Sequence, residues 1–222
     1  VLVVGGGNSA CAVAREAARV AASADLSMRT GYWFLPKTAF GRPLTDLPIW
    51  TLPVFVQRLV LRALIRITIG DYRSYGLARP THRIFERHPM FGTEVLGYIR
   101  QGRVKPRADI ERLEGDRAYF KDGTSGNYDL IVAATGYRQS FPFLPAGLVG
   151  VVNDAAQIYC GAFPPNVRNL YIVGSNQPRN GFGGVLTPAC DLYARMIRMQ
   201  DELEPNLGDI FANNGDRLPV TN

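Results

Sequence analysis

Short apolar runs alternate with segments in which apolar residues recur every three or four positions, and this alternation predicts a parallel α/β fold. Residues 1–4 form an apolar run that predicts a buried strand, and residues 8–24 place alanine and valine at helical spacing. Leu26–Arg29 predicts a second strand. A strand, a glycine turn, a helix and a strand within about 30 residues predict a right-handed βαβ unit.

The middle of the chain predicts a helical insertion followed by a small antiparallel meander. Four prolines over residues 35–53 predict a loop, whereas residues 54–69 predict a helix with Arg58, Arg62 and Arg66 on one face. We favour an ordinary amphipathic helix with its charged side in water over a helix that lies on a membrane surface. The shorter elements that follow are a helix at 91–101 and strands at 104, 110–113 and 118–120, with a hairpin turn at Asp122-Gly123.

Two further apolar runs in the last third of the chain predict buried strands, each followed by glycine. Residues 130–134 lead into Thr135-Gly136-Tyr137, and residues 170–173 end at Gly174. A glycine-rich loop then leads into a predicted helix in which Thr187 is the N-cap and Pro188 the first helical residue. Residues 205–222 predict a polar tail.

The turn after the first strand carries the most specific motif. Gly5-Gly6-Gly7-Asn8-Ser9-Ala10 has the form G-x-G-x-x-A, follows a predicted strand and opens a predicted helix. In that context the first glycine makes a tight turn, the second lets the backbone approach a pyrophosphate, and Ala10 lets helix and strand pack closely. The free N–H groups and the positive dipole end of the helix favour phosphate. The motif predicts dinucleotide binding.

The residue that follows the second strand decides between the two nicotinamide cofactors. An NAD site places Asp or Glu there, whereas an NADP site places a cation. Arg29 offers a planar fork for phosphate oxygens and Thr30 a hydroxyl. Asp25 is the competing candidate, but it precedes the predicted strand. We therefore favour NADPH over NADH.

Composition narrows the remaining classes of function. The 222 residues carry a formal net charge of +6, but the basic residues are spread out and the aromatic residues match no RNA-binding motif, which argues against nucleic acid. Three distant cysteines predict reduced thiols in the cytoplasm. His82 and His88 lack companions at ligand spacing, so we expect no metal. No apolar run reaches the length of about 18 residues that a membrane span needs.

These motifs together resemble the flavin-containing monooxygenases. The resemblance rests on Gly-x-Gly-Asn-Ser-Ala, followed much later by Ala-Thr-Gly-Tyr, and covers roughly residues 1–200. The segments between them, residues 76–80, 97–104 and 120–123, look like the YUCCA-type branch and its bacterial relatives.

The resemblance implies an α/β protein with two nucleotide sites. Residues 1–130 would form a Rossmann-like NADPH-binding domain with a helical insertion at 50–100, residues 131–204 the C-terminal part of an FAD-binding domain, and residues 205–222 a tail. The residues implied to contact either cofactor are Gly5, Gly7, Asn8, Ser9, Ala10, Arg29, Thr30, Thr135, Gly136, Tyr137, Gly174, Gly183, Gly184 and Thr187. A helix beginning at Thr187 would stabilise negative charge on reduced flavin.

The implied activity is an NADPH- and FAD-dependent monooxygenase, in which hydride passes to FAD and a flavin hydroperoxide transfers oxygen to a small organic substrate. No side chain is assigned as catalytic, and the sequence leaves a homodimer open. A flavin-dependent reductase without oxygenation and a non-catalytic NAD(P)-binding module remain alternatives. Because the family's first FAD motif has no counterpart and Val1 lies within a strand, we expect the chain to be the later part of a longer enzyme.

Overall fold

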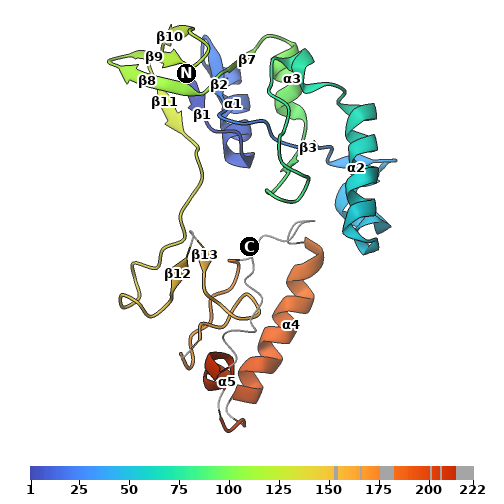
Figure 1. The fold of residues 1–222 in the computed structure, drawn as a ribbon, viewed down its shortest axis with the longest axis vertical. Coiled ribbons are helices and arrows are strands. Elements are labelled where there is room, and N and C mark those ends of the chain that lie inside the picture. Colours follow the sequence, from blue (N-terminus) through green and yellow to red (C-terminus); the bar gives the residue numbers. More distant parts are fainter. Residues whose placement is uncertain (153–154, 166, 176–182, 201, 206, 214–222) are drawn as a thin grey trace. The chain divides into compact units, whose positions relative to one another are not determined.

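The computed structural model describes residues 1–152, 155–165, 167–175, 183–200, 202–205 and 207–213. The chain divides into two compact units, Val1–Gly136 and Tyr137–Asn222. Figure 1 shows the first unit from blue to yellow-green and the second from yellow to red. Each unit is described by itself below.

A four-stranded parallel sheet forms the centre of the first unit, as the sequence predicts. Its strands lie in the order β11 (Ile131–Ala133), β1 (Leu2–Val4), β2 (Ala24–Ser27) and β7 (Val104–Arg107). β1 pairs with β11 on one side and β2 on the other. The carboxyl ends of β1, β2 and β11 therefore meet at one edge of the sheet, which is where nucleotides bind in such folds.

β2 differs from its predicted position. It runs over Ala24–Ser27 instead of Leu26–Arg29, so Asp25 lies inside the strand and Arg29 two residues beyond it. All four residues of β2 are buried, including Asp25. A carboxylate can be buried in a strand only when it has partners within the protein, and these partners allow the strand to include Asp25. Those partners, Arg107 and Tyr128, come from segments that are distant in sequence.

Neighbouring residues of β1 pack against the two different layers that cover the faces of the sheet. Val3 belongs to the core shared with α1 (Asn8–Val20) and α3 (Glu94–Arg100), whereas Leu2 packs with Ala118 and Phe120 of the meander. Adjacent side chains of a strand point to opposite faces, so helices cover one face and the meander the other. Figure 1 shows α3 and the meander on opposite sides of β1 and β2. α1 presents alanines to the sheet, which allows close packing.

The predicted meander is present. Its strands are β8 (Ile110–Glu114), β9 (Arg117–Phe120) and β10 (Ser125–Asn127), all antiparallel. Gly123 takes a φ of +81° in the turn between β9 and β10, so the hairpin lies where Asp122-Gly123 predicts it.

The insertion leaves the sheet after β2 and returns to it before α3. β3 (Phe34–Leu35) pairs in parallel with β6 (Met90–Phe91), which closes the insertion at its base. The segment predicted as a loop from its prolines also contains short elements that were not predicted. They are β4 (Thr38–Ala39), β5 (Arg42–Pro43), and the 3-10 helices η1 (Leu44–Asp46) and η2 (Pro48–Thr51). The long helix α2 (Val54–Thr68) and the 3-10 helix η3 (Tyr72–Tyr75) follow.

α2 is a helix as predicted, but the predicted exposure of its charged face is only partly correct. Arg62 and Arg66 are exposed, whereas Arg58 is half-buried and donates from Nε to the Ile84 carbonyl at 2.9 Å. Large apolar side chains are also exposed on this helix, including Phe55 at 74% and Ile67 at 82%. No helix among the described residues is long and apolar enough to cross a membrane.

The second unit contains β12 (Val151–Val152), β13 (Ala155–Ala156), α4 (Gly183–Gln200) and α5 (Leu207–Asn213). Its core gathers Ala162, Phe163 and Leu207. α5 lies within the segment that the sequence predicts as a polar tail, because Leu207 supplies a buried apolar anchor.

Two predictions in the second unit are wrong. Residues 170–173 form no strand, since Ile172 N–H pairs with Ala162 but no ladder extends on either side. α4 begins at Gly183, so Thr187 lies inside the helix and Pro188 is not its first residue. Pro188 is the sixth residue of α4 and lies beyond its first turn, so it removes one backbone hydrogen bond inside the helix.

Candidate functional site: the glycine loop and the edge of the parallel sheet

The glycine loop fits tightly between two strands at the carboxyl edge of the sheet. Gly5 has a φ of +130°, and its N–H donates to the Ser27 carbonyl of β2 at 2.9 Å. A Cβ on Gly5 would overlap the carbonyl oxygen of Ala134, which follows β11. A side chain at this position would therefore meet both a strained backbone and a steric clash.

Gly6 meets a residue that the sequence analysis missed. A Cβ there would overlap the ring of Tyr32, which is half-buried just beyond β2. The preceding residue, Gly31, lies so close to the backbone of Ala78 and Arg79 that a Cβ there would overlap it. This close approach places Tyr32 beside Gly6. The signal in the sequence is the Gly31-Tyr32 pair, which begins four residues after the end of β2.

The amino end of α1 presents free backbone donors. Cys11 N–H makes the first intrahelical bond, to the Gly7 carbonyl at 3.0 Å. The amides of Asn8, Ser9 and Ala10 therefore have no partner within the helix, and none of the described residues accepts from them. Asn8 and Ser9 are exposed and Ala10 is fully buried. Unpaired amides at the positive end of a 13-residue helix can bind an anion without any side chain.

The segment after β2 carries the predicted cation. Arg29 is exposed, and Thr30 is partly buried, with its hydroxyl oxygen 3.2 Å from Nη1 of Arg87. Arg87 comes from the far end of the insertion and was not predicted. The structure thus brings two arginines to the residues that follow β2.

Asp25, the competing candidate, points into the protein. It is 4% exposed, and its Oδ2 accepts from Arg107 Nε and from the Tyr128 hydroxyl, both at 2.6 Å. The carboxylate raises the pKa of Arg107 through its hydrogen bond, and burial raises the pKa of Tyr128 to about 12. A carboxylate with these partners is not available to a ribose hydroxyl.

A cavity of about 240 Å³ lies beside the first turns of α1. Asn8 and Arg15 line it from the helix, and Lys37 and Glu94 form an ion pair at 2.6 Å across it. The hydrogen bond from Lys37 lowers the pKa of Glu94. Cys11 also lines this cavity, but burial raises the pKa of its thiol to about 12, so it is not a nucleophile at neutral pH.

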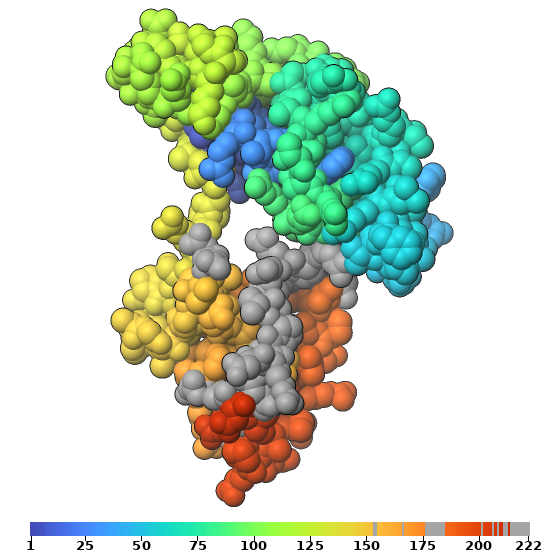
Figure 2. All heavy atoms as spheres, in the orientation of Figure 1, coloured from blue at the N-terminus to red at the C-terminus, as the bar shows by residue number. Residues whose placement is uncertain are grey.

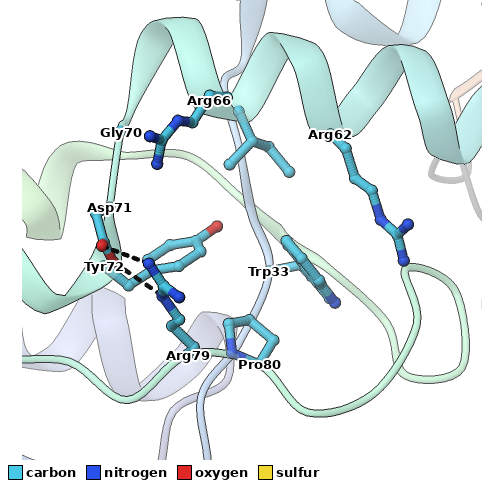
Figure 3. A pocket seen from close by; sticks show the side chains of 9 residues that line it. Trp33, Arg62, Arg66, Gly70, Asp71, Tyr72, Arg79 and Pro80 are labelled. Atoms are coloured by element: carbon cyan, nitrogen blue, oxygen red, sulfur yellow. Dashed lines mark hydrogen bonds and ion pairs between the residues drawn. The ribbon is translucent and has the colours of Figure 1, made fainter.

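A second cavity of about 330 Å³ lies under α2 and contains none of the predicted residues. Figure 3 shows Arg62 and Arg66 extending from α2 on either side of the hollow, with Asp71 hydrogen-bonded to Arg79 at its rim. Hydrogen bonds from Arg79 and Arg73 hold the pKa of Asp71 well below its usual range. In Figure 2 the blue β1–α1 segment lies between the meander and this insertion.

Thr135, Gly136 and Tyr137 continue from the strand that contacts the glycine loop. Ala134 N–H donates to the Val4 carbonyl at 2.8 Å, so the segment starts beside Gly5. Thr135 and Gly136 are exposed and Tyr137 is 94% exposed. Gly136 takes a φ of +104°, which turns the chain at the boundary between the units.

The remaining predicted residues belong to the second unit. Gly174 has a φ of +91° and Thr187 is exposed within α4. Gly183 and Gly184 form the first residues of that helix. The rest of the predicted glycine-rich loop, residues 180–182, lies outside the described residues.

The sequence profile of the flavin-binding monooxygenase-like family matches residues 1–200. The chain belongs to this family. The resemblance in the glycine and Ala-Thr-Gly motifs is thereby confirmed at the level of the family.

A curated relative agrees with this assignment, and two solved structures share the fold. Flavin-containing monooxygenase 5 of Oryctolagus cuniculus is 30% identical over an alignment of 206 positions that covers 88% of this chain and 38% of that protein. A flavin-containing monooxygenase from Stenotrophomonas maltophilia shares the fold with a TM-score of 0.51 and 18% identity, over 87% of this chain and 48% of that one. A cyclohexanone-bound cyclohexanone monooxygenase gives a TM-score of 0.57 at 15% identity, over 97% and 54%. The chain thus matches less than half the length of the rabbit family member.

Proposed function

We propose that this chain is the NADPH-binding domain and part of the FAD-binding domain of a flavin-dependent monooxygenase. Residues 1–130 would bind NADPH, and residues 131–204 would contribute to the FAD site. FAD, when bound, would accept hydride from NADPH and react with dioxygen, so that one oxygen atom passes to a small organic substrate.

The glycine loop is the observation that carries the proposal. A positive φ and a tight turn at Gly5, open space around Gly7 where the backbone can approach a phosphate, and the unpaired amides at the start of α1 support pyrophosphate binding. The backbone of residues 5–10 would hold the two phosphates, and the cofactor would run across the carboxyl edge of β1 and β2. The role of these residues is to bind and orient, not to transfer a proton.

The cation after β2 supports NADPH over NADH. Arg29 would contact the 2′-phosphate with its fork of N–H groups, and Thr30 would add a hydroxyl. An NADH site would need an available carboxylate in this place, but Asp25 is buried and paired.

The flavin side of the proposal rests on the family match. Thr135, Gly136 and Tyr137 would cross from one nucleotide domain to the other, and Gly174, Gly183, Gly184 and Thr187 would belong to the C-terminal part of the flavin site. The helix whose amino end serves that site would begin at Gly183. The three free cysteines agree with a cytoplasmic location for such an enzyme.

The Arg29→Gln variant tests the nucleotide assignment. We expect NADPH to bind at least tenfold more weakly, as loss of a charge-assisted contact of about 1.5–3 kcal/mol implies, and NADH to bind unchanged. Titration of cofactor fluorescence measures both affinities. Equal affinities of variant and wild type for NADPH would contradict the assignment.

A second experiment separates oxygenation from simple flavin reduction. The protein that carries the complete flavin site should consume NADPH and dioxygen in equal amounts with formation of an oxygenated product. Hydrogen peroxide in the same amount as the NADPH consumed, without oxygenated product, would favour a flavin reductase.

A further inference from the structure

A loop of the insertion is fixed against the residues that follow β2. The Trp33 indole N–H donates to the His82 carbonyl at 2.8 Å, and Arg58 Nε donates to the Ile84 carbonyl at 2.9 Å. Both contacts join segments more than twenty residues apart. They hold residues 82–87 in place, so the position of Arg87 beside Thr30 does not depend on one exposed side chain.

The charge of Arg87 is not neutralised by the nearest acid. Glu86 accepts from the Arg83 backbone N–H at 2.8 Å, and its carboxylate lies 3.8 Å from Arg83 Nε. Among the described residues no carboxylate forms an ion pair with Arg87 or Arg29. Burial, and after it the charge of Arg87, lowers the pKa of His82.

We propose that Arg87 is a second cation for the 2′-phosphate of NADPH and a determinant of its selection over NADH. The inference rests on the proposed NADPH site and adds a residue from outside the glycine motif. Arg87 Nη1 now donates to the Thr30 hydroxyl at 3.2 Å, and a phosphate oxygen beside Thr30 would accept from the same guanidinium. Arg29 reaches that phosphate along the chain and Arg87 from the insertion.

Adenosine 2′,5′-bisphosphate and adenosine 5′-monophosphate are the probes, because they differ only in the 2′-phosphate. Calorimetric titration of the 222-residue chain gives the affinity for each. We expect Arg87→Gln to weaken bisphosphate binding about tenfold and to leave monophosphate binding unchanged. Arg87→Lys should recover part of the loss, since it restores the charge without the planar fork.

Arg117→Gln is the matched control. Arg117 is exposed on β9, donates to the Ser125 hydroxyl, lies over the Tyr119 ring, and belongs to the meander on the opposite face of the sheet. The control removes the same charge, so it should leave both affinities unchanged. If it weakens the bisphosphate as much as Arg87→Gln does, net charge explains the effect and the proposal is overturned.

Comparison with Arg29→Gln separates this inference from the proposed function. Weak bisphosphate binding in Arg29→Gln with normal binding in Arg87→Gln overturns the role of Arg87 and retains the NADPH site. Normal binding in both variants overturns both proposals. Equal weakening of both nucleotides in Arg87→Gln, with a lowered urea midpoint, assigns Arg87 to the structure of the loop and also overturns the inference.

Discussion

Replacing Asp25 by asparagine tests whether the acid of β2 serves the fold or the nucleotide. Its carboxylate is nearly inaccessible and holds together three segments, namely β2, β7 through Arg107 and the residue after β10 through Tyr128. The geometry assigns it to the fold. The Asp25→Asn variant should therefore lose stability and keep its preference between the two nicotinamide cofactors.

The expected loss follows from the two hydrogen bonds. In wild type, Asp25 accepts two charge-assisted hydrogen bonds of about 1.5–3 kcal/mol each. The neutral amide of asparagine can accept only one hydrogen bond in their place, worth about 1 kcal/mol. Arg107 is 25% exposed, so it regains some hydration and the loss stays below the roughly 3–5 kcal/mol of a fully buried broken pair. We expect about 2 kcal/mol for Asp25→Asn, which corresponds to a fall in Tm of roughly 4–8 °C.

Urea unfolding measures this loss, and a double-mutant cycle with Tyr128→Phe isolates the contact between the two side chains. The variant should also lower the pKa of Tyr128, because its hydrogen bond to Asp25 and the charge of that carboxylate both raise it. Ultraviolet titration of the phenol detects the change. A free energy of unfolding within about 0.5 kcal/mol of wild type, or weaker NADH binding without loss of stability, would refute the structural role.

Two further predictions concern the loop and the insertion. Gly5→Ala should lower the free energy of unfolding in urea by at least about 1–3 kcal/mol and abolish measurable NADPH binding. Gly102→Ala is the control, because Gly102 has a φ of +72° but open space around it. It should show the cost of backbone strain without a steric clash and keep its affinity for NADPH. If both variants bind NADPH equally, the contact with Ala134 is irrelevant. Asp71→Asn should lower the thermal midpoint at pH 7, and the difference from wild type should shrink as the pH falls below about 4 and disappear only below the folded pKa of Asp71, which lies well under its usual range. The folded pKa of Asp71 is depressed, so its stabilisation is present above the unfolded value of about 3.9 and is lost as the pH falls through the folded value. A difference between Asp71→Asn and wild type that does not change with pH would contradict this linkage.

Local sequence patterns predicted β1 and β11 of the parallel sheet well, because each is a short apolar run that leads into a glycine turn. The glycine loop and α1 follow from the motif within residues 1–20, although the loop also packs against Ala134 after β11 and against Tyr32. The limits of β2 did not follow, because burial of Asp25 depends on Arg107 and Tyr128, about eighty and one hundred positions away.

The second unit was predicted less well for a related reason. The apolar run at residues 170–173 has strand composition, but a strand exists only with a neighbour to pair with, and only Ile172 finds one. The Thr-Pro pair at 187–188 is a typical helix start, yet α4 begins four residues earlier. Propensity set the type of element correctly there, and it could not set the boundary.

The insertion is the part that sequence reasoning undervalued, because its contribution to the nucleotide edge depends on long-range contacts. β3 and β6 pair at its base, Gly31 approaches the backbone at residues 78–79, and Trp33 bonds to residue 82. Each contact holds the chain after β2 against a segment some fifty residues later. These contacts also position the Tyr32 ring beside Gly6 and Arg87 beside Thr30, where we propose that it contacts the 2′-phosphate. The insertion is therefore a structural part of the proposed nucleotide site, and the features that distinguish this site from a bare βαβ unit come from residues that no local motif contains.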